Sequence, residues 1–147
     1  MRNRPALFHD VAHFAPADRQ ASAWKAVVMQ DPHAQEFLST YVRVIETDEG
    51  ELVAIGGVQP LWAGVGEIWV SLGPLAFEHA VVTARHMKKI LRIAERDFSF
   101  HRVQAACEIT QEVTHNFLEH LGYKYEGTHM GLYERGVIYK MYAKVLG

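Results

Sequence analysis

The stretch 114–127, THNFLEHLGYKYEG, joins a short helix directly to a strand. Phe117, Leu118 and Leu121 recur at the three- and four-residue spacing of an amphipathic helix. Gly122 follows the last of them, at the position of a C-terminal helix cap. Aromatic and polar residues then alternate, as they do in a half-buried strand. The stretch therefore predicts a helix that ends at a glycine and continues as a strand.

The composition of the chain predicts one globular domain that spans residues 1–147. Apolar residues make up 49% of the chain and charged residues 22%, which excludes a disordered or fibrous protein. The formal net charge is -2, so no overall basic excess would attract nucleic acid. The sequence therefore has no strong signal for a nucleic-acid partner.

Cysteine and histidine positions argue against disulfide and metal sites. Cys107 is the single cysteine, which excludes a disulfide framework and a cysteine-rich metal site. His9 and His13 are four residues apart, but Asp10 would not share their face of a helix, so we expect no metal site.

The sequence shows no sign of secretion or membrane insertion. The start lacks the apolar core of a signal peptide, and no apolar run approaches the roughly 20 residues that cross a bilayer. We expect an intracellular protein with no secretion signal and no membrane segment.

The hydrophobic periodicity predicts the element order β-αα-βββ-α-β-α-ββ. The expected strands cover residues 5–8, 41–47, 51–62, 66–72, 102–110, 123–133 and 137–145, and the expected helices cover 17–29, 32–40, 77–98 and 111–121. Turns at 48–50 and 134–136 predict two hairpins, and the strand after the long helix is expected parallel to the one before it. The fold class is therefore α/β (α+β), with a mixed, mostly antiparallel sheet.

Two local patterns refine this prediction. Gly56 and Gly57 lie inside a strand, which indicates either a bulge or a close approach of another backbone. The long helix is expected to bury one apolar stripe against the sheet. The stripe consists of Phe77, Ala80, Val81, Ala84, Met87, Ile90, Leu91, Ala94 and Phe98.

The element order and the opening stretch together resemble the GCN5-related N-acetyltransferase (GNAT) fold. In that family the helix after the fifth strand often reads N-x-x-A-x-x-F-Y-E-K-L-G-F, and a glycine follows a few residues later. The segment 111–123, QEVTHNFLEHLGY, matches at Phe117, Glu119, Leu121, Gly122 and Tyr123, and Gly127 follows. The closing YKMYAK also looks like the family's final strand, so the resemblance covers about residues 41–144.

The resemblance implies an acetyl-CoA site but two of its usual parts are changed. The family binds the pyrophosphate on a Q/R-x-x-G-x-G/A loop, whose backbone N–H groups face the phosphates. The matching segment here has Gly73 but no second glycine, and Pro74 removes one N–H donor. Leu118 stands where many members have the tyrosine that protonates the leaving thiolate.

If the protein is an enzyme, Glu67, Glu108 and Tyr123 are the candidate catalytic residues. Glu67 shares a strand face with Trp69 and Ser71 and is expected to be the general base, although it could also be a solvated carboxylate at a strand end. Glu108 could do acid–base work or pair with an arginine at an edge. Tyr123, or the nearby Tyr125 and Tyr133, could replace the missing acid or be half-buried sheet residues.

The resemblance also implies where acetyl-CoA, if it is the cofactor, would lie. Its pantetheine arm is expected to pair like an added strand with the backbone of Val70, Ser71, Leu72 and Gly73.

One branch with similar departures is phage-encoded. Small internal virion proteins of short-tailed phages resemble this chain in a helix with H-x-x-F/W-L-x-x-x-G, which Phe117, Leu118 and Gly122 match. This resemblance implies a structural or accessory virion component used in assembly or DNA ejection, located in the virion or host cytoplasm. Its partners would be other virion proteins or a second copy of the chain. The alternative is an acetyl-CoA-dependent N-acyltransferase that acts on a primary amine.

Overall fold

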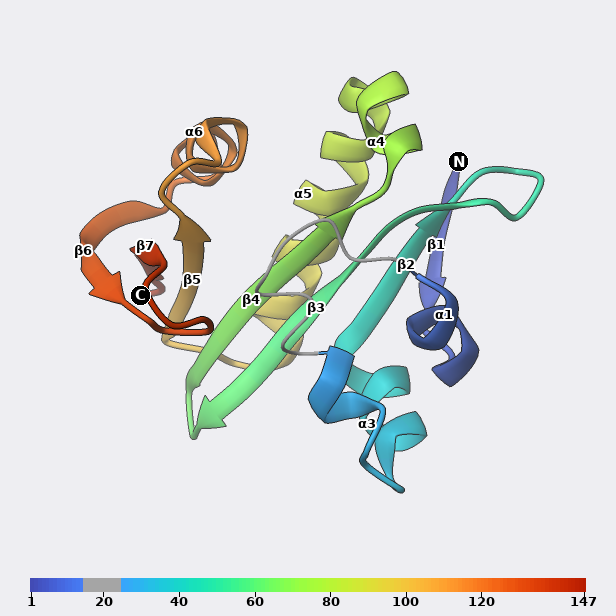
Figure 1. Ribbon diagram of the computed structural model, residues 1–147, viewed down its shortest axis with the longest axis horizontal. Coiled ribbons are helices and arrows are strands. Elements are labelled where there is room, and N and C mark those ends of the chain that lie inside the picture. The colour runs from blue at the N-terminus through green and yellow to red at the C-terminus, as the bar shows by residue number, and fades with distance from the viewer. Residues whose placement is uncertain (15–24) are drawn as a thin grey trace.

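A seven-stranded mixed sheet forms the centre of the computed structural model, which describes residues 1–14 and 25–147 (Figure 1). The strands are β1 (Arg2–Pro5), β2 (Val42–Glu46), β3 (Leu52–Trp62), β4 (Val65–Leu72), β5 (Arg102–Glu108), β6 (Lys124–Met130) and β7 (Ile138–Val145). The helices are α1 (Phe8–His13), α3 (Ala34–Tyr41), α4 (Pro74–Glu78), α5 (Ala80–Asp97) and α6 (Glu112–His120). The strand order is β1-β2-β3-β4-β5-β7-β6.

The predicted fold class is confirmed. Every neighbouring pair of strands is antiparallel except β4 and β5, which are parallel and are joined through α5, as the sequence predicts. The stretch 114–127 forms the end of α6 and the start of β6, with Gly122 between them at a φ of 94°. Glycine adopts this left-handed conformation without steric cost, which explains its use as the helix cap.

The N-terminal segment differs from its prediction. The first strand is β1, so it ends at Pro5 instead of beginning there, and Phe8 starts a helix. The Asp10 carboxylate accepts the Leu7 N–H at 2.7 Å, which satisfies a donor at the start of α1 and favours the helix. The helix predicted at 17–29 lies mostly outside the described residues, although residues 25–28 are helical.

Helices cover both faces of the sheet. On one face, Val11 of α1 and Leu38 of α3 pack in one cluster with Val44, Ile55 and Trp69. On the other face, Met87 and Ile90 of α5 pack against a second cluster that includes Ile45 and Ala54. The alternating side chains of each strand therefore contribute to two separate apolar layers, one on each face of the sheet.

The long helix predicted at 77–98 is interrupted. His79, with φ -120° and ψ 44°, is not helical, and it separates α4 from α5. The interruption changes which side chains face the sheet, and Phe77 and Val81 are 65% and 66% exposed. Their prediction as part of a buried stripe is therefore wrong.

The glycine pair of β3 allows close approach of neighbouring strands. A side chain at Gly57 would meet the carbonyl oxygen of Tyr41, and one at Gly56 would lie 2.8 Å from the carbonyl oxygen of Trp69. The register is regular at both positions, so the alternative of a bulge does not apply there.

No helix in residues 1–14 and 25–147 is long and apolar enough to cross a membrane.

Candidate active site

The candidate site lies where β4 and β5 separate. Their pairing runs from Val65 with Arg102 to Glu67 with Gln104, and both strands then continue for several residues without further recorded pairs. Figure 1 shows the two strands diverging beyond this point. Glu67 is therefore the last residue of β4 that pairs with β5, and it lies at the apex of the split.

The backbone of β4 presents alternate residues to the split. The Gly73 N–H donates to Val53 of β3 at 2.8 Å, and Ser71 is paired with Ile55 two residues earlier. Because successive residues of a strand point their polar groups to opposite sides, the N–H and C=O groups of Ile68, Val70 and Leu72 point away from β3, toward β5. Of the residues predicted to pair with a pantetheine arm, Val70 and Leu72 have this orientation, whereas Ser71 and Gly73 direct their amides to β3.

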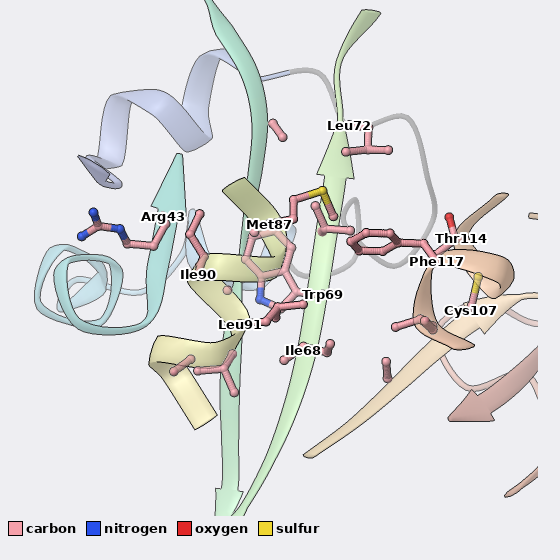
Figure 2. Close-up of a pocket in the computed structure, with 18 of the residues that line it drawn as sticks. Arg43, Ile68, Trp69, Leu72, Met87, Ile90, Leu91, Cys107, Thr114 and Phe117 are labelled. Carbon is pink, nitrogen blue, oxygen red and sulfur yellow. The ribbon is translucent and has the colours of Figure 1, made fainter. Parts of the chain in front are cut away.

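A cavity of about 930 Å³ opens at the split. Figure 2 shows Met87, Ile90 and Leu91 of α5 on one side of it and Phe117 of α6 pointing across toward β4. Val70 and Leu72, whose side chains lie on the α5 face of the sheet, line the cavity. Ala106 and Tyr139 also line it, and their side chains lie on the opposite face. The cavity therefore connects the two faces of the sheet through the split.

A tyrosine from a distant loop contacts Glu67. The Tyr133 hydroxyl donates to Glu67 Oε2 at 2.9 Å, and the Tyr133 ring packs edge-on against Tyr139 with centroids 5.3 Å apart. Glu67 is half-buried. The carboxylate is thus held in one orientation beside the split, on the face opposite α5.

Glu108 lines the cavity at the end of β5. Its Oε1 accepts a hydrogen bond from Thr110 Oγ1 at 3.4 Å, and its backbone oxygen accepts one from His115 Nε2 at 2.9 Å. The structure therefore places Glu67 and Glu108 at the two ends of the open part of the split, one at its apex and one at its wide end.

Tyr123 lies in the core, away from the split. It is buried, it does not line the cavity, and its hydroxyl donates to Glu95 at 3.2 Å. Burial, together with the nearby Glu95 charge, raises the pKa of Tyr123 well above its usual range. The structure thus brings Tyr133 to Glu67 and leaves Tyr123 in the core, although the sequence grouped them together.

Leu118 is a core residue. It packs in the cluster that contains Ala105 and Cys107, and Leu91 of α5 and Phe98, which directly follows α5, pack against this cluster. Leu118 also lines the cavity, but a leucine cannot donate a proton and so cannot take the role of the family's tyrosine.

The loop after β4 contains no glycine-rich turn. Gly73 is the N-cap of α4, whose first residue is Pro74, and Glu78 ends that short helix. The first turn of α5 contains no acidic residue. The partial positive charge of the N–H groups at its start is therefore not offset by a carboxylate in that turn.

Known proteins resemble this chain in structure. No protein-family model matches it, and no curated protein matches it either. A ribosomal-protein-alanine N-acetyltransferase from Brucella melitensis is 14% identical, with a TM-score of 0.71 over 99% of this chain and 100% of that one. A GNAT-family acetyltransferase from Bacillus anthracis is 16% identical, with a TM-score of 0.65 over 97% and 93%. A spermidine N-acetyltransferase from Vibrio cholerae is 10% identical, with a TM-score of 0.68 over 99% and 95%.

These likenesses concern the fold. The similar structures named here are acetyltransferases and give no support for a phage or virion origin. The split sheet, the strand order and the structural matches agree with one another, and together they show that the protein has the fold of the GNAT acetyltransferases.

Proposed function

We propose that the protein is an N-acyltransferase that moves an acyl group from coenzyme A to a primary amine. The observation that supports this most directly is the cavity that passes through the split, because Ile68 and Trp69 line it and directly follow the oriented Glu67, although Glu67 itself is not part of the lining. Bound coenzyme A would supply the acyl group as a thioester. The outward N–H and C=O groups of Val70 and Leu72, which lie beyond the last pair of β4 with β5, would hold its pantetheine arm, as an added strand is held.

The residues present fit a direct transfer. The amine nitrogen forms a C–N bond to the carbonyl carbon as the C–S bond breaks, giving an amide and a free thiol. Glu67 takes the proton that the amine loses, because it is the oriented carboxylate at the apex of the split. The leaving thiolate takes its proton from water, since Leu118 cannot provide one.

Calorimetric titration with acetyl-CoA, followed by an assay of thiol release with a panel of primary amines, tests the proposal. We expect binding in the micromolar range and amine-dependent thiol release. If acyl-CoA does not bind at millimolar concentration, the proposal is wrong.

A structural or accessory role in a phage particle is the second candidate. It rests on Leu118 and on the missing glycine-rich loop, because both remove parts that acetyl transfer usually employs. Copurification of the chain in stoichiometric amounts with particles would support it, whereas a chain found free of particles in infected cells would contradict it. The acetyltransferase names of the similar structures favour the enzyme.

The substitution Tyr133→Phe tests whether Tyr133 orients the Glu67 carboxylate without contributing to binding of the acyl donor. The substitution keeps the ring against Tyr139 but removes the hydrogen bond to Glu67. We expect kcat to fall about tenfold, in keeping with the net strength of about 1.5 kcal/mol for a hydrogen bond to a charged group. The Kd for the acyl donor should stay unchanged. Tyr125→Phe is the matched control, because its hydroxyl contacts Thr128 and not Glu67; an equal fall in both variants would contradict the role of Tyr133.

A further inference from the structure

The side of α5 that faces the sheet is incompletely packed. Thr83 is the buried residue of this 18-residue helix, while Met87, Ile90, Leu91 and Ala94 line the cavity and stay half-buried. Apolar side chains that face a sheet are normally covered in the core. The cavity therefore extends from the split to the space between α5 and the sheet.

Small residues form the floor beneath α5. Ala54 and Gly56 lie on the α5 face of β3, and both line the cavity. Gly56 sits in register between Arg43 of β2 and Val70 of β4, so one row of side chains has a gap in its middle. The gap is a consequence of the glycine that the close spacing of β3 and β4 requires.

The cavity reaches well beyond the split. Its lining continues across β3 to Tyr41 at the end of α3, to Arg43 of β2 and to Asn3 of β1. From β4 to β1 there are three strand spacings, on the order of 14 Å. Figure 2 shows the Arg43 guanidinium directed away from α5, and it donates to Asn3 Oδ1 at 2.6 Å. The space under α5 is thus mostly apolar, with Asn3 and Arg43 at its far end and Asp97 at the end of α5.

An acetyl group would leave most of this space empty. The whole cavity, which includes the split where the pantetheine arm would lie, measures about 930 Å³, near the upper end of the roughly 300–1,000 Å³ that is common for mostly apolar ligand sites. Apolar lining of this kind favours apolar parts of a ligand. A longer acyl chain, continuous with a thioester at the split, matches both the shape and the chemistry of the lining.

We propose that the preferred acyl donor has a medium- to long-chain alkyl group, which lies between α5 and the sheet. This inference rests on the proposed function, because it takes the thioester to lie at the split. It adds that chain length, more than the acetyl group, determines which donor binds.

Titration with acetyl-, hexanoyl- and decanoyl-CoA measures the effect of chain length. Burial of each methylene is worth at most about a fourfold gain in affinity. We expect the Kd to fall stepwise along the series, by at least about tenfold overall, since only part of that limit is commonly realised. Binding of all three with equal Kd would overturn this inference and leave the proposed function intact. If none of the three binds, the proposed function itself fails.

Two variants fill the space. Ala94→Phe and Ile90→Phe each place a ring on the cavity side of α5, and Arg92→Phe places the same ring on its exposed side as a control. The filling variants should bind decanoyl-CoA no more tightly than acetyl-CoA, and their Kd for acetyl-CoA should equal that of the wild type. They should unfold at an equal or higher temperature. The control Arg92→Phe should show the same stepwise fall in Kd from acetyl-CoA to decanoyl-CoA as the wild type. If both folded filling variants retain wild-type affinity for decanoyl-CoA, the chain does not lie under α5.

Discussion

Replacement of Glu67 by glutamine is expected to lower kcat/KM for the amine about a hundredfold to ten-thousandfold, the usual contribution of a general base. Glutamine keeps the size of the side chain and still accepts the hydrogen bond from Tyr133, but it cannot take a proton from the amine. The thiol released from the donor, followed over time with the amine in excess, measures the loss. The donor Kd should not change, because the pantetheine arm contacts the backbone of β4.

Glu49→Gln is the matched control for this prediction. Glu49 is an exposed carboxylate in the turn between β2 and β3, away from the cavity lining. Its replacement should leave kcat/KM unchanged and confirm that net charge is not the cause. Activity of Glu67→Gln within twofold of the wild type, in a protein that unfolds at the same temperature, would exclude Glu67 as the base.

Arg4→Met is expected to lower the free energy of unfolding by about 3 kcal/mol at neutral pH, the low end for a broken buried ion pair. The Arg4 guanidinium donates to both oxygens of Asp10, at 2.8 and 2.9 Å, and to Glu46 at 3.2 Å. Asp10 and Glu46 are 1% and 4% exposed. Removal of the shared cation would leave a buried carboxylate on α1 without its charged partner and another on β2 with only Arg2.

This loss should shrink in acid. Burial raises the pKa of Asp10, but the hydrogen bonds from Arg4 and from the Leu7 N–H outweigh it, so the pKa lies below its ordinary value. The hydrogen bond from Arg2, aided by Arg4, likewise lowers the pKa of Glu46 against its burial. Both groups stabilise the fold above their unfolded pKa values of about 3.9 and 4.3, and this stability is lost as the pH falls through the lowered pKa values.

Urea unfolding of the wild type and Arg4→Met at neutral pH and below about pH 4 measures the difference. Arg96→Met is the control, because the exposed Arg96–Asp97 pair should contribute less than about 1 kcal/mol. A destabilisation by Arg4→Met that does not shrink in acid would show that packing of the arginine stem, and not its charge, is responsible.

The sheet could be predicted because its signals are local. The alternation of Glu67, Trp69 and Ser71, the turn at 48–50 and the glycine after Leu121 each depend on a few neighbouring residues, and each gives the observed element. The start of the chain was harder, because α1 depends on the carboxylate of Asp10, which both caps the helix and pairs with Arg4 of the strand before it. Neither contact follows from hydrophobic periodicity.

The site could be predicted only in part, because it depends on contacts between distant segments. Glu67 follows from its place in the strand, but its contact with Tyr133 joins residues 66 positions apart. Tyr123 and Tyr133 look equivalent in the sequence, and only the packing of β7 against its neighbours separates a core tyrosine from a site tyrosine. The cavity under α5 was predicted as packed core, because a helical stripe does not reveal the small residues of the strand opposite it.

Amide chemical shifts of the labelled protein, recorded with and without decanoyl-CoA, test the central claim most directly. We expect the largest changes, and new protection from hydrogen exchange, at the N–H groups of Val70 and Leu72, because these point into the split beyond the last pair of β4 with β5, Glu67 with Gln104. The interleaved N–H groups of Trp69 and Ser71 should change less, since they remain paired with β3. Saturating ligand that leaves the outward amides of β4 unchanged would contradict the placement of the acyl donor in the split.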